Sequence, residues 1–208
     1  MPQPESRRTR LSPEREAEIF TATLDLIREV GYEAARLDTV AQRSQCSKAT
    51  LYRRWQGKPR LVSEALRHGK PFTLAGLDTG SLRGDLYEMT SRIGKARKDH
   101  ALMRGIALAV RQDSALADAM HETLVRPDLE AARGIVDRAI ARGEVDPANP
   151  ALAFFPHLIQ GAGFARLVFD QREPDADYLR RYVDAVALPV LLREIDSSAT
   201  DTSLRSTT

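Results

Sequence analysis

Apolar residues recur at helical spacing along most of the chain, and no segment shows the strict alternation of a β-strand. The first stripe includes Ile19 and Leu26, which share one helix face because seven residues span about two turns. Ser12 and Pro13 precede this stripe, and a capping serine followed by proline is typical of a helix start. The pattern predicts a helix that begins at Pro13 and ends at Gly31.

Two short helices and a fourth helix are predicted to follow. Asp38 is expected to cap the first short helix, which runs to about residue 44. Ser47 is expected to cap the second, which ends near Trp55. Pro59 then stands where a new helix begins.

The glycine- and proline-containing segment around residues 69–80 marks a loop and a domain boundary. Helices are predicted beyond it, with kinks at Pro127 and Pro189, over residues 81–98, 101–112, 115–142, 150–169 and 175–195. We therefore expect an all-α protein of about nine helices. Its expected parts are a disordered basic arm (1–11), a helix-turn-helix domain (12–70), a C-terminal helical domain (71–195) and a disordered tail (196–208).

The composition is that of a soluble protein, with 42% hydrophobic and 29% charged residues among 208. No run of about 18 apolar residues is present, so no membrane span is expected. No apolar segment follows the basic residues at the N-terminus, which argues against a secretory signal. The lone Cys46 fits a reducing compartment. We expect a cytoplasmic location.

Positive charge is concentrated rather than spread. Between Arg36 and Arg60 there are seven basic residues and one acidic residue, Asp38. A merely solvated helix face would mix the two signs, as residues 81–146 do. The local excess indicates a polyanionic partner.

Two short helices joined by a tight turn and preceded by a longer helix form a helix-turn-helix, whose second short helix enters the DNA major groove. The inner faces of such a motif need small or apolar residues. The expected inner residues are Val40, Ala41, Cys46 and Leu51. The expected outer residues, which are short or basic, are Lys48, Ala49, Arg53 and Arg54.

Residues 15–66 resemble the TetR family of transcriptional regulators. The matching residues include Gly31-Tyr32, Val40-Ala41 and the segment "TLYRRWQGK" from Thr50 to Lys58. Three positions depart from the family pattern. Gln45 replaces the usual turn glycine, which costs about 1 kcal/mol in a left-handed conformation. Trp55 replaces phenylalanine, and Pro59 replaces an acidic residue.

The resemblance implies roles for individual residues. Thr50 and Tyr52 are expected to contact phosphates, with Thr50 also near a base, and Lys58 is expected to hold a phosphate. Lys48 and Ala49 begin the reading helix, where base edges come within reach. Arg53 and Arg54 are expected to meet bases or phosphates. The implied DNA-binding set is completed by Ser47 and by Arg7, Arg8 and Arg10, which form either a minor-groove arm or only a soluble tail.

The resemblance also implies an effector cavity and a homodimer in the C-terminal domain. Apolar helix residues are candidates for the cavity, with plain core packing as the alternative for each. These are Met89, Ile93, Met103, Ile106, Val110, Leu124, Phe155 and Leu158. The last two helices are expected to form the dimer interface. Its candidates are Gly161, Phe164, Leu179, Val183, Val186 and Val190.

The leading hypothesis is a dimeric repressor that a small molecule of unknown identity releases from a palindromic operator in double-stranded DNA. An activator, or a regulator without a ligand, is an alternative within transcription. A helical small-molecule binding protein without DNA binding is a second alternative, which the basic reading helix disfavours. An all-α enzyme is a third. No catalytic residues, metal-ligand pattern or cofactor motif are recognised to support it.

Overall fold

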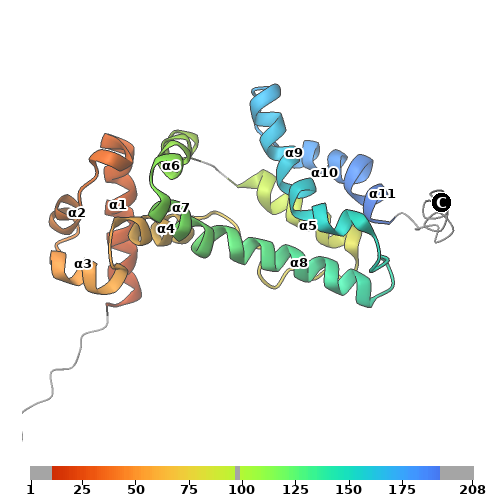
Figure 1. Ribbon diagram of the computed structural model, residues 1–208, viewed down its shortest axis with the longest axis horizontal. Helices are drawn as coiled ribbons and strands as arrows, with labels where there is room; N and C mark the ends of the chain where they lie inside the picture. Colours follow the sequence, from red (N-terminus) through yellow and green to blue (C-terminus); the bar gives the residue numbers. More distant parts are fainter. Residues whose placement is uncertain (1–10, 97–98, 193–208) are drawn as a thin grey trace, which may run out of the picture. The chain divides into compact units, whose positions relative to one another are not determined.

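The computed structural model describes residues 11–96 and 99–192, and within these ranges the chain contains helices and no strands. The predicted all-α class is confirmed. The helices form nine continuous segments over the described residues (Figure 1). They are α1 (Pro13–Ala34), α2 (Leu37–Arg43), α3 (Lys48–Trp55), α4 (Lys58–His68), α5 (Leu82–Lys95), α6 (His100–Gln112), α7 (Ser114–Met120) with η1 (His121–Val125) and α8 (Arg126–Ala141), η2 (Pro150–Phe154) with α9 (Phe155–Phe169), and α10 (Ala176–Tyr182) with η3 (Val183–Ala187) and α11 (Leu188–Leu191).

The chain divides into two compact units. Of the described residues, the first contains 11–71 and 99–127, and the second contains 72–96 and 128–192. In the first unit α1 packs against α4 and α6, and α4 packs against α7. The helix-turn-helix helices therefore share a compact unit with α6 and α7, which follow the loop where we placed the domain boundary.

The core of the first unit joins residues that are far apart in the sequence. Ile19, Leu51 and Trp55 are at most 1% exposed, and Ile106 and Leu116 from α6 and α7 belong to the same cluster. Burying a large apolar side chain contributes about 1.5–3 kcal/mol. Packing against α6 and α7 thus stabilises the helix-turn-helix.

Local capping explains where several helices begin. The side chains of Ser12, Ser47 and Asn149 each accept a hydrogen bond from the first turn of the helix that follows, as predicted for Ser12 and Ser47. The prediction for Asp38 was wrong. Helix α2 begins at Leu37, two residues before the start that a cap at Asp38 implies, and the carboxylate of Asp38 pairs with Lys48 instead of capping.

Gly31 interrupts α1 with a φ of 79°, in the left-handed region that favours glycine. The helix was predicted to end at Gly31. In the structure Gly31 breaks the helix, and one further turn continues to Ala34. This last turn carries Tyr32, whose side chain is buried.

Wide helical turns precede the two prolines that were predicted to cause kinks. The π-helical segment η1 ends two residues before Pro127, and η3 ends two residues before Pro189. Proline has no N–H for the carbonyl four residues earlier, so the preceding turn must bond differently. Both prolines thus lie within continuous helical segments.

The core of the second unit is built mainly from α5, α8 and α11. Fully buried residues from these three helices, Leu86, Ile135 and Leu191, belong to one cluster. Helix α10 packs against α5, and α9 contacts α10.

Candidate DNA-binding surface

The turn between α2 and α3 has the geometry expected for its sequence. Gln45 adopts a φ of 50°, which confirms that glutamine takes the left-handed conformation here. The amide of Cys46 donates to the carbonyl of Ala41 at 2.8 Å. Arg15 from α1 donates to the carbonyl of Ser44 at 2.7 Å. These two hydrogen bonds provide partners for backbone groups on both sides of Gln45. They help to offset the energetic cost of its left-handed conformation.

The inner side of α3 is fixed to α1 and α4. Leu51 is 1% exposed and Trp55 is fully buried. The indole of Trp55 lies edge-on to Phe20 with ring centroids 5.6 Å apart, and its Nε1 donates to Glu64 at 3.0 Å. Trp55 is therefore a core residue of the first unit. A tightly held α3 can present its outer side in one orientation.

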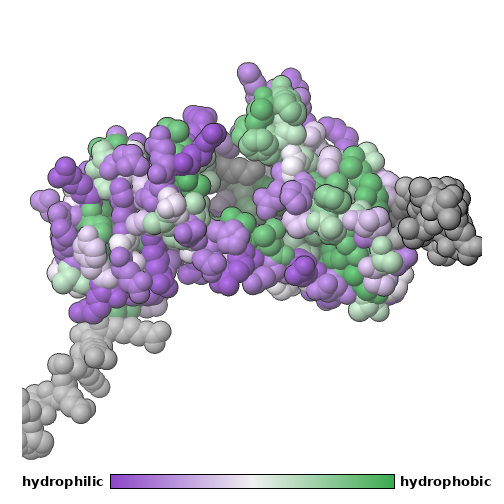
Figure 2. Space-filling model, in the orientation of Figure 1, coloured by the Kyte–Doolittle hydropathy of each residue, from purple (hydrophilic) through white to green (hydrophobic). Residues whose placement is uncertain are grey.

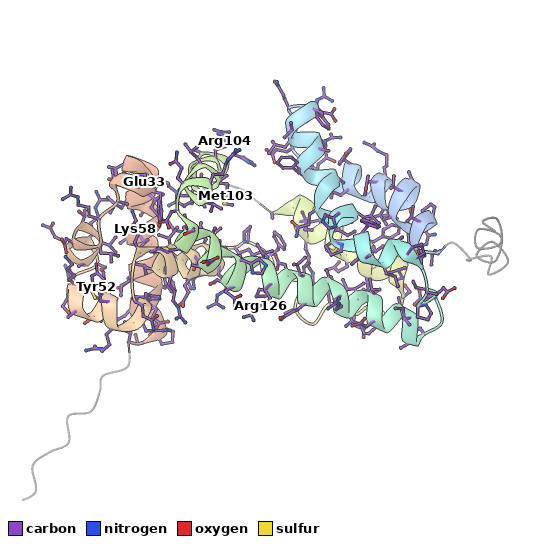
Figure 3. All side chains as sticks on the ribbon, viewed as in Figure 1. Glu33, Tyr52, Lys58, Met103, Arg104 and Arg126 are labelled. Atoms are coloured by element: carbon purple, nitrogen blue, oxygen red, sulfur yellow. The ribbon has the colours of Figure 1, made fainter. Side chains whose placement is uncertain are left out.

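The outer side of α3 presents polar and basic side chains. Lys48, Ala49, Arg53 and Arg54 are exposed, and Tyr52 is 48% exposed. Tyr52 therefore does not serve mainly as a packing residue (Figure 3). Two more residues of the predicted set begin the helix, where the hydroxyls of Ser47 and Thr50 lie 2.8 Å apart.

Two of the basic residues on α3 are paired with acidic residues of other helices. Lys48 lies 2.8 Å from Asp38, and Arg54 lies 2.8 Å from Glu16. These hydrogen bonds raise the pKa values of Lys48 and Arg54 above their ordinary values, so both stay protonated. Arg53 has no ion-pair partner within the described part of the chain. The reading helix thus holds two restrained cations and one unrestrained guanidinium.

Lys58, at the first position of α4, is held by the end of α1. Its Nζ donates to the carbonyl of Tyr32 at 2.9 Å and lies 4.0 Å from the centre of the Tyr32 ring. The carbonyl of Glu33 lies 3.4 Å from the same atom. An ammonium has three donors, so these two carbonyls leave one donor available. Arg7, Arg8 and Arg10 of the expected arm lie outside the described residues.

The structure places the eight candidate cavity residues in two different units. In the first unit, Ile106 is a core residue, Val110 and Leu124 pack against that core, and Met103 is 46% exposed. In the second unit, Met89 and Phe155 are core residues, Ile93 packs against them, and Leu158 is half-buried. The buried members fill the cores of their own units.

The six candidate interface residues also differ in exposure. Leu179 and Val183 are 4% and 1% exposed and are covered by the chain itself, and Val186 is half-buried. Phe164 is 70% exposed, Val190 is 37% exposed, and Gly161 is exposed. The accessible members of the set therefore lie on α9 and α11.

An apolar stripe on the η2–α9 segment contains Gly161 and Phe164, which were predicted as interface residues, and extends beyond them to Phe154 and Val168. Phe154, Gly161, Phe164 and Val168 are exposed and recur at spacings of three, four and seven residues, which puts them on one helix face. Figure 2 shows hydrophobic residues on the surface of this helix. The helical spacing was the available signal, but a buried core helix has the same pattern.

Among the described residues, Pro150–Phe169 is the helix long and apolar enough to cross a membrane, and 11% of an 18-residue stretch of it is buried. A search for consecutive apolar residues does not detect it, because His157, Gln160 and Arg166 interrupt the run. An apolar surface of this length is a common mark of an interface.

Known proteins match both parts of the chain. The family model described as bacterial regulatory proteins, tetR family, matches residues 19–65, and a tetracyclin repressor-like C-terminal domain matches residues 77–186. An HTH-type transcriptional regulator of Mycobacterium bovis is 33% identical over 180 residues, which cover 86% of this chain and 89% of that protein.

Further relatives have the same character. A DNA-binding transcriptional repressor TetR of Mycobacteroides abscessus is 33% identical over 135 residues, covering 62% of this chain and 70% of that protein. The solved structure of the flavonoid-responsive regulator FrrA superposes with a TM-score of 0.61 at 22% identity, covering 84% of this chain and 93% of that one. The chain belongs to the TetR family and is a DNA-binding transcriptional regulator.

Proposed function

We propose that this regulator is a dimeric repressor that binds a palindromic operator through α3 and leaves it when a small molecule binds the C-terminal domain. The observation that carries the proposal is the outer side of α3, with its basic residues exposed and its inner side locked by Trp55. A two-fold dimer matches two half-sites roughly 34–36 Å apart on DNA.

We assign DNA contacts to individual residues within this proposal. Arg53, which has no ion-pair partner in the described ranges, together with Lys48 and Ala49, reads base edges. Ser47, Thr50, Tyr52, Arg54 and Lys58 hold phosphates, which fix the register of the domain without reading sequence.

The second copy is proposed to cover the apolar stripe on η2–α9, together with exposed residues of α11. The stripe repeats at the spacing that helix pairs use, and Gly161 within it allows close approach of two helices. Covering this surface in a dimer of a cytoplasmic regulator is the role we assign to it, rather than insertion in a membrane. No enzymatic activity is part of the proposal.

The effector is proposed to be apolar. Exposed apolar side chains on α6, Met103 at 46% and Leu108 at 60%, offer it contacts in the first unit. Its displacement of DNA requires that it bind the DNA-free conformation more tightly, typically by about 1–3 kcal/mol. One solved structure of the same fold is that of a transcriptional regulator FadR from Bacillus subtilis in complex with stearoyl-CoA.

Selection of bound duplexes from a random pool, at near-physiological salt, tests the proposal. Enrichment of a palindrome with half-sites one DNA turn apart is the expected result. Sequence-independent, salt-sensitive binding alone would contradict it. Sedimentation of the protein with the enriched duplex then gives the stoichiometry, for which two chains or a multiple of two per duplex is expected.

A further inference from the structure

The ammonium of Lys58, proposed to hold a phosphate, joins the ends of two helices. It lies at the start of α4 and donates to the carbonyl of Tyr32, in the last turn of α1. The same carbonyl accepts from the amide of Ala35 at 3.2 Å, so Lys58 adds a second, charged donor at the end of the helix. The Tyr32 ring, 4.0 Å away, adds the attraction between a cation and an aromatic face. The position of Lys58 therefore depends on that of Tyr32.

Tyr32 is in turn fixed at its other end. Its side chain is 3% exposed, and its hydroxyl donates to Oδ2 of Asp113 at 2.7 Å. Burial is the main cause that raises the pKa of Tyr32 above its ordinary value, and the hydrogen bond to this carboxylate is the second. The hydroxyl therefore stays protonated and remains a donor.

Asp113 lies at the junction of α6 and α7 and is bonded there as well. Its Oδ1 accepts from the amide of Leu116 at 3.1 Å and caps α7. The hydrogen bond from Tyr32 comes first among the causes that lower the pKa of Asp113, and the charge of Lys58 also contributes. Asp113 thus stays ionised at neutral pH and connects the α6–α7 junction to Tyr32.

These contacts form a continuous series from the α6–α7 junction to the start of α4, all within the first unit. Bonds in such a series strengthen one another, because a carboxylate that accepts from the phenol increases the electron density of the ring. Two carbonyls engage or approach the ammonium, and its third donor remains for DNA.

We infer that Tyr32 is a positioning residue for DNA binding: held by Asp113, it places the Lys58 ammonium where a DNA phosphate meets it. The affinity for DNA then depends on the conformation of the α6–α7 junction. The inference rests on the proposed phosphate contact of Lys58. It identifies a route by which a change at α6 or α7 weakens DNA binding without altering any residue on α3.

Two substitutions at a distance from α3 distinguish this positioning role from a change in charge or a loss of local structure. Tyr32→Phe keeps the ring and removes the bond to Asp113. Asp113→Ser keeps a capping oxygen for α7 but is too short to reach the Tyr32 hydroxyl. Removing the negative charge of Asp113 would by itself increase the affinity for DNA. A decrease in affinity for Asp113→Ser therefore cannot come from the change in charge alone.

The experiment measures dissociation constants of the full chain between about 50 and 200 mM salt. The probe is the duplex enriched from the random pool, with a mixed-sequence duplex beside it. Lys58→Ala is expected to weaken binding about 10-fold and to reduce the salt slope by about one. Tyr32→Phe and Asp113→Ser are each expected to weaken binding about 3- to 10-fold, with a reduced slope. Each double variant that also carries Lys58→Ala is expected to bind as weakly as Lys58→Ala alone, and no more weakly.

Tyr182→Phe provides the matched control, because this half-buried tyrosine lies on α10 in the other unit. It is expected to bind DNA as the wild type does. Thermal unfolding of each variant identifies any that fails to fold, and the inference then depends on the other member of the Tyr32–Asp113 pair. Wild-type affinity in both variants, or losses that add to that of Lys58→Ala, would overturn it. A wild type that binds no DNA would instead remove the proposed function itself.

Discussion

Nε of Arg54 donates a hydrogen bond to Oε1 of Glu16 at 2.8 Å, which ties the end of α3 to the first turn of α1. The two residues are 38 positions apart, and both side chains are partly exposed, at 44% and 24%. Such a pair contributes at most about 1 kcal/mol to stability. Its more important effect is that it restrains a guanidinium beside the proposed DNA-binding surface.

Glu16→Gln is expected to increase DNA affinity about 2- to 5-fold at low salt, because it removes a negative charge and weakens the hold on Arg54. The amide can still accept a hydrogen bond, so the free energy of unfolding should fall by less than about 1 kcal/mol. Anisotropy titrations and urea unfolding measure the two quantities. Glu29→Gln, which weakens the Arg43 ion pair on α2, is the control. Weaker DNA binding by Glu16→Gln would contradict the expectation.

Arg53 and Arg54 are adjacent in the sequence but differ in their restraints. Arg53→Ala is expected to cost about 1–3 kcal/mol of binding to the operator and to relax base preference at one position in each half-site. Arg54→Ala is expected to weaken binding to all duplexes about equally, because it removes a phosphate contact. Selection from a random pool with each variant distinguishes the two. A shift of base preference in Arg54→Ala alone would reverse the two assignments.

Trp55→Phe restores the residue that the family pattern usually has at this position. The smaller ring leaves part of a fully buried site empty and leaves Glu64 without the indole donor. A loss of about 1–3 kcal/mol in unfolding free energy is expected, from the cavity and the lost bond together. Urea unfolding measures it. Combining it with Glu64→Gln should cost less than the sum of the two changes, and full additivity would show that the Trp55–Glu64 bond contributes nothing.

The stability of the first unit is expected to decrease at acid pH through Asp99. A hydrogen bond from Arg28 at 2.6 Å is the main cause that lowers the pKa of Asp99. A hydrogen bond from the amide of Leu102 is the second cause. A carboxylate with a lowered native pKa stabilises the fold above its unfolded pKa of about 3.9, and this contribution is lost as the pH falls through the native value. Urea unfolding between pH 7 and pH 2.5 should show a smaller decrease for Asp99→Asn than for the wild type. Asp118→Asn, which alters an exposed residue of α7, should behave as the wild type. Equal decreases in Asp99→Asn and the wild type would contradict the role of Asp99.

The features that the sequence predicted well are governed by short-range physics. Ser12 and Ser47 cap helices within three residues of themselves, and Gln45 lies in a turn bounded by its near neighbours. The restraints on the candidate site depend instead on folding. The bond between Tyr32 and Asp113 spans 81 positions, and no local spacing indicates it.

The apolar residues of the C-terminal helices show the same limit. Met89 and Ile106 have the same character in the sequence, with helical spacing and apolar neighbours. The structure buries them in two different cores. Periodicity identifies the buried face of a helix, but the partner of that face is decided by the path of the whole chain.

Phe164 is the most direct test of the proposed dimer, because it is 70% exposed in the middle of the apolar stripe on α9. In a dimer that covers the stripe, Phe164→Glu would bury two carboxylates related by symmetry without partners, at a cost of several kcal/mol. We expect the variant to sediment as a monomer at micromolar concentration while its thermal unfolding remains cooperative. Leu108→Glu, at a position 60% exposed on α6, is the matched control and should remain dimeric. DNA binding should weaken far more for Phe164→Glu than for the control, since separate chains lose the gain from binding two half-sites together. A dimer that survives Phe164→Glu would place the interface on another surface.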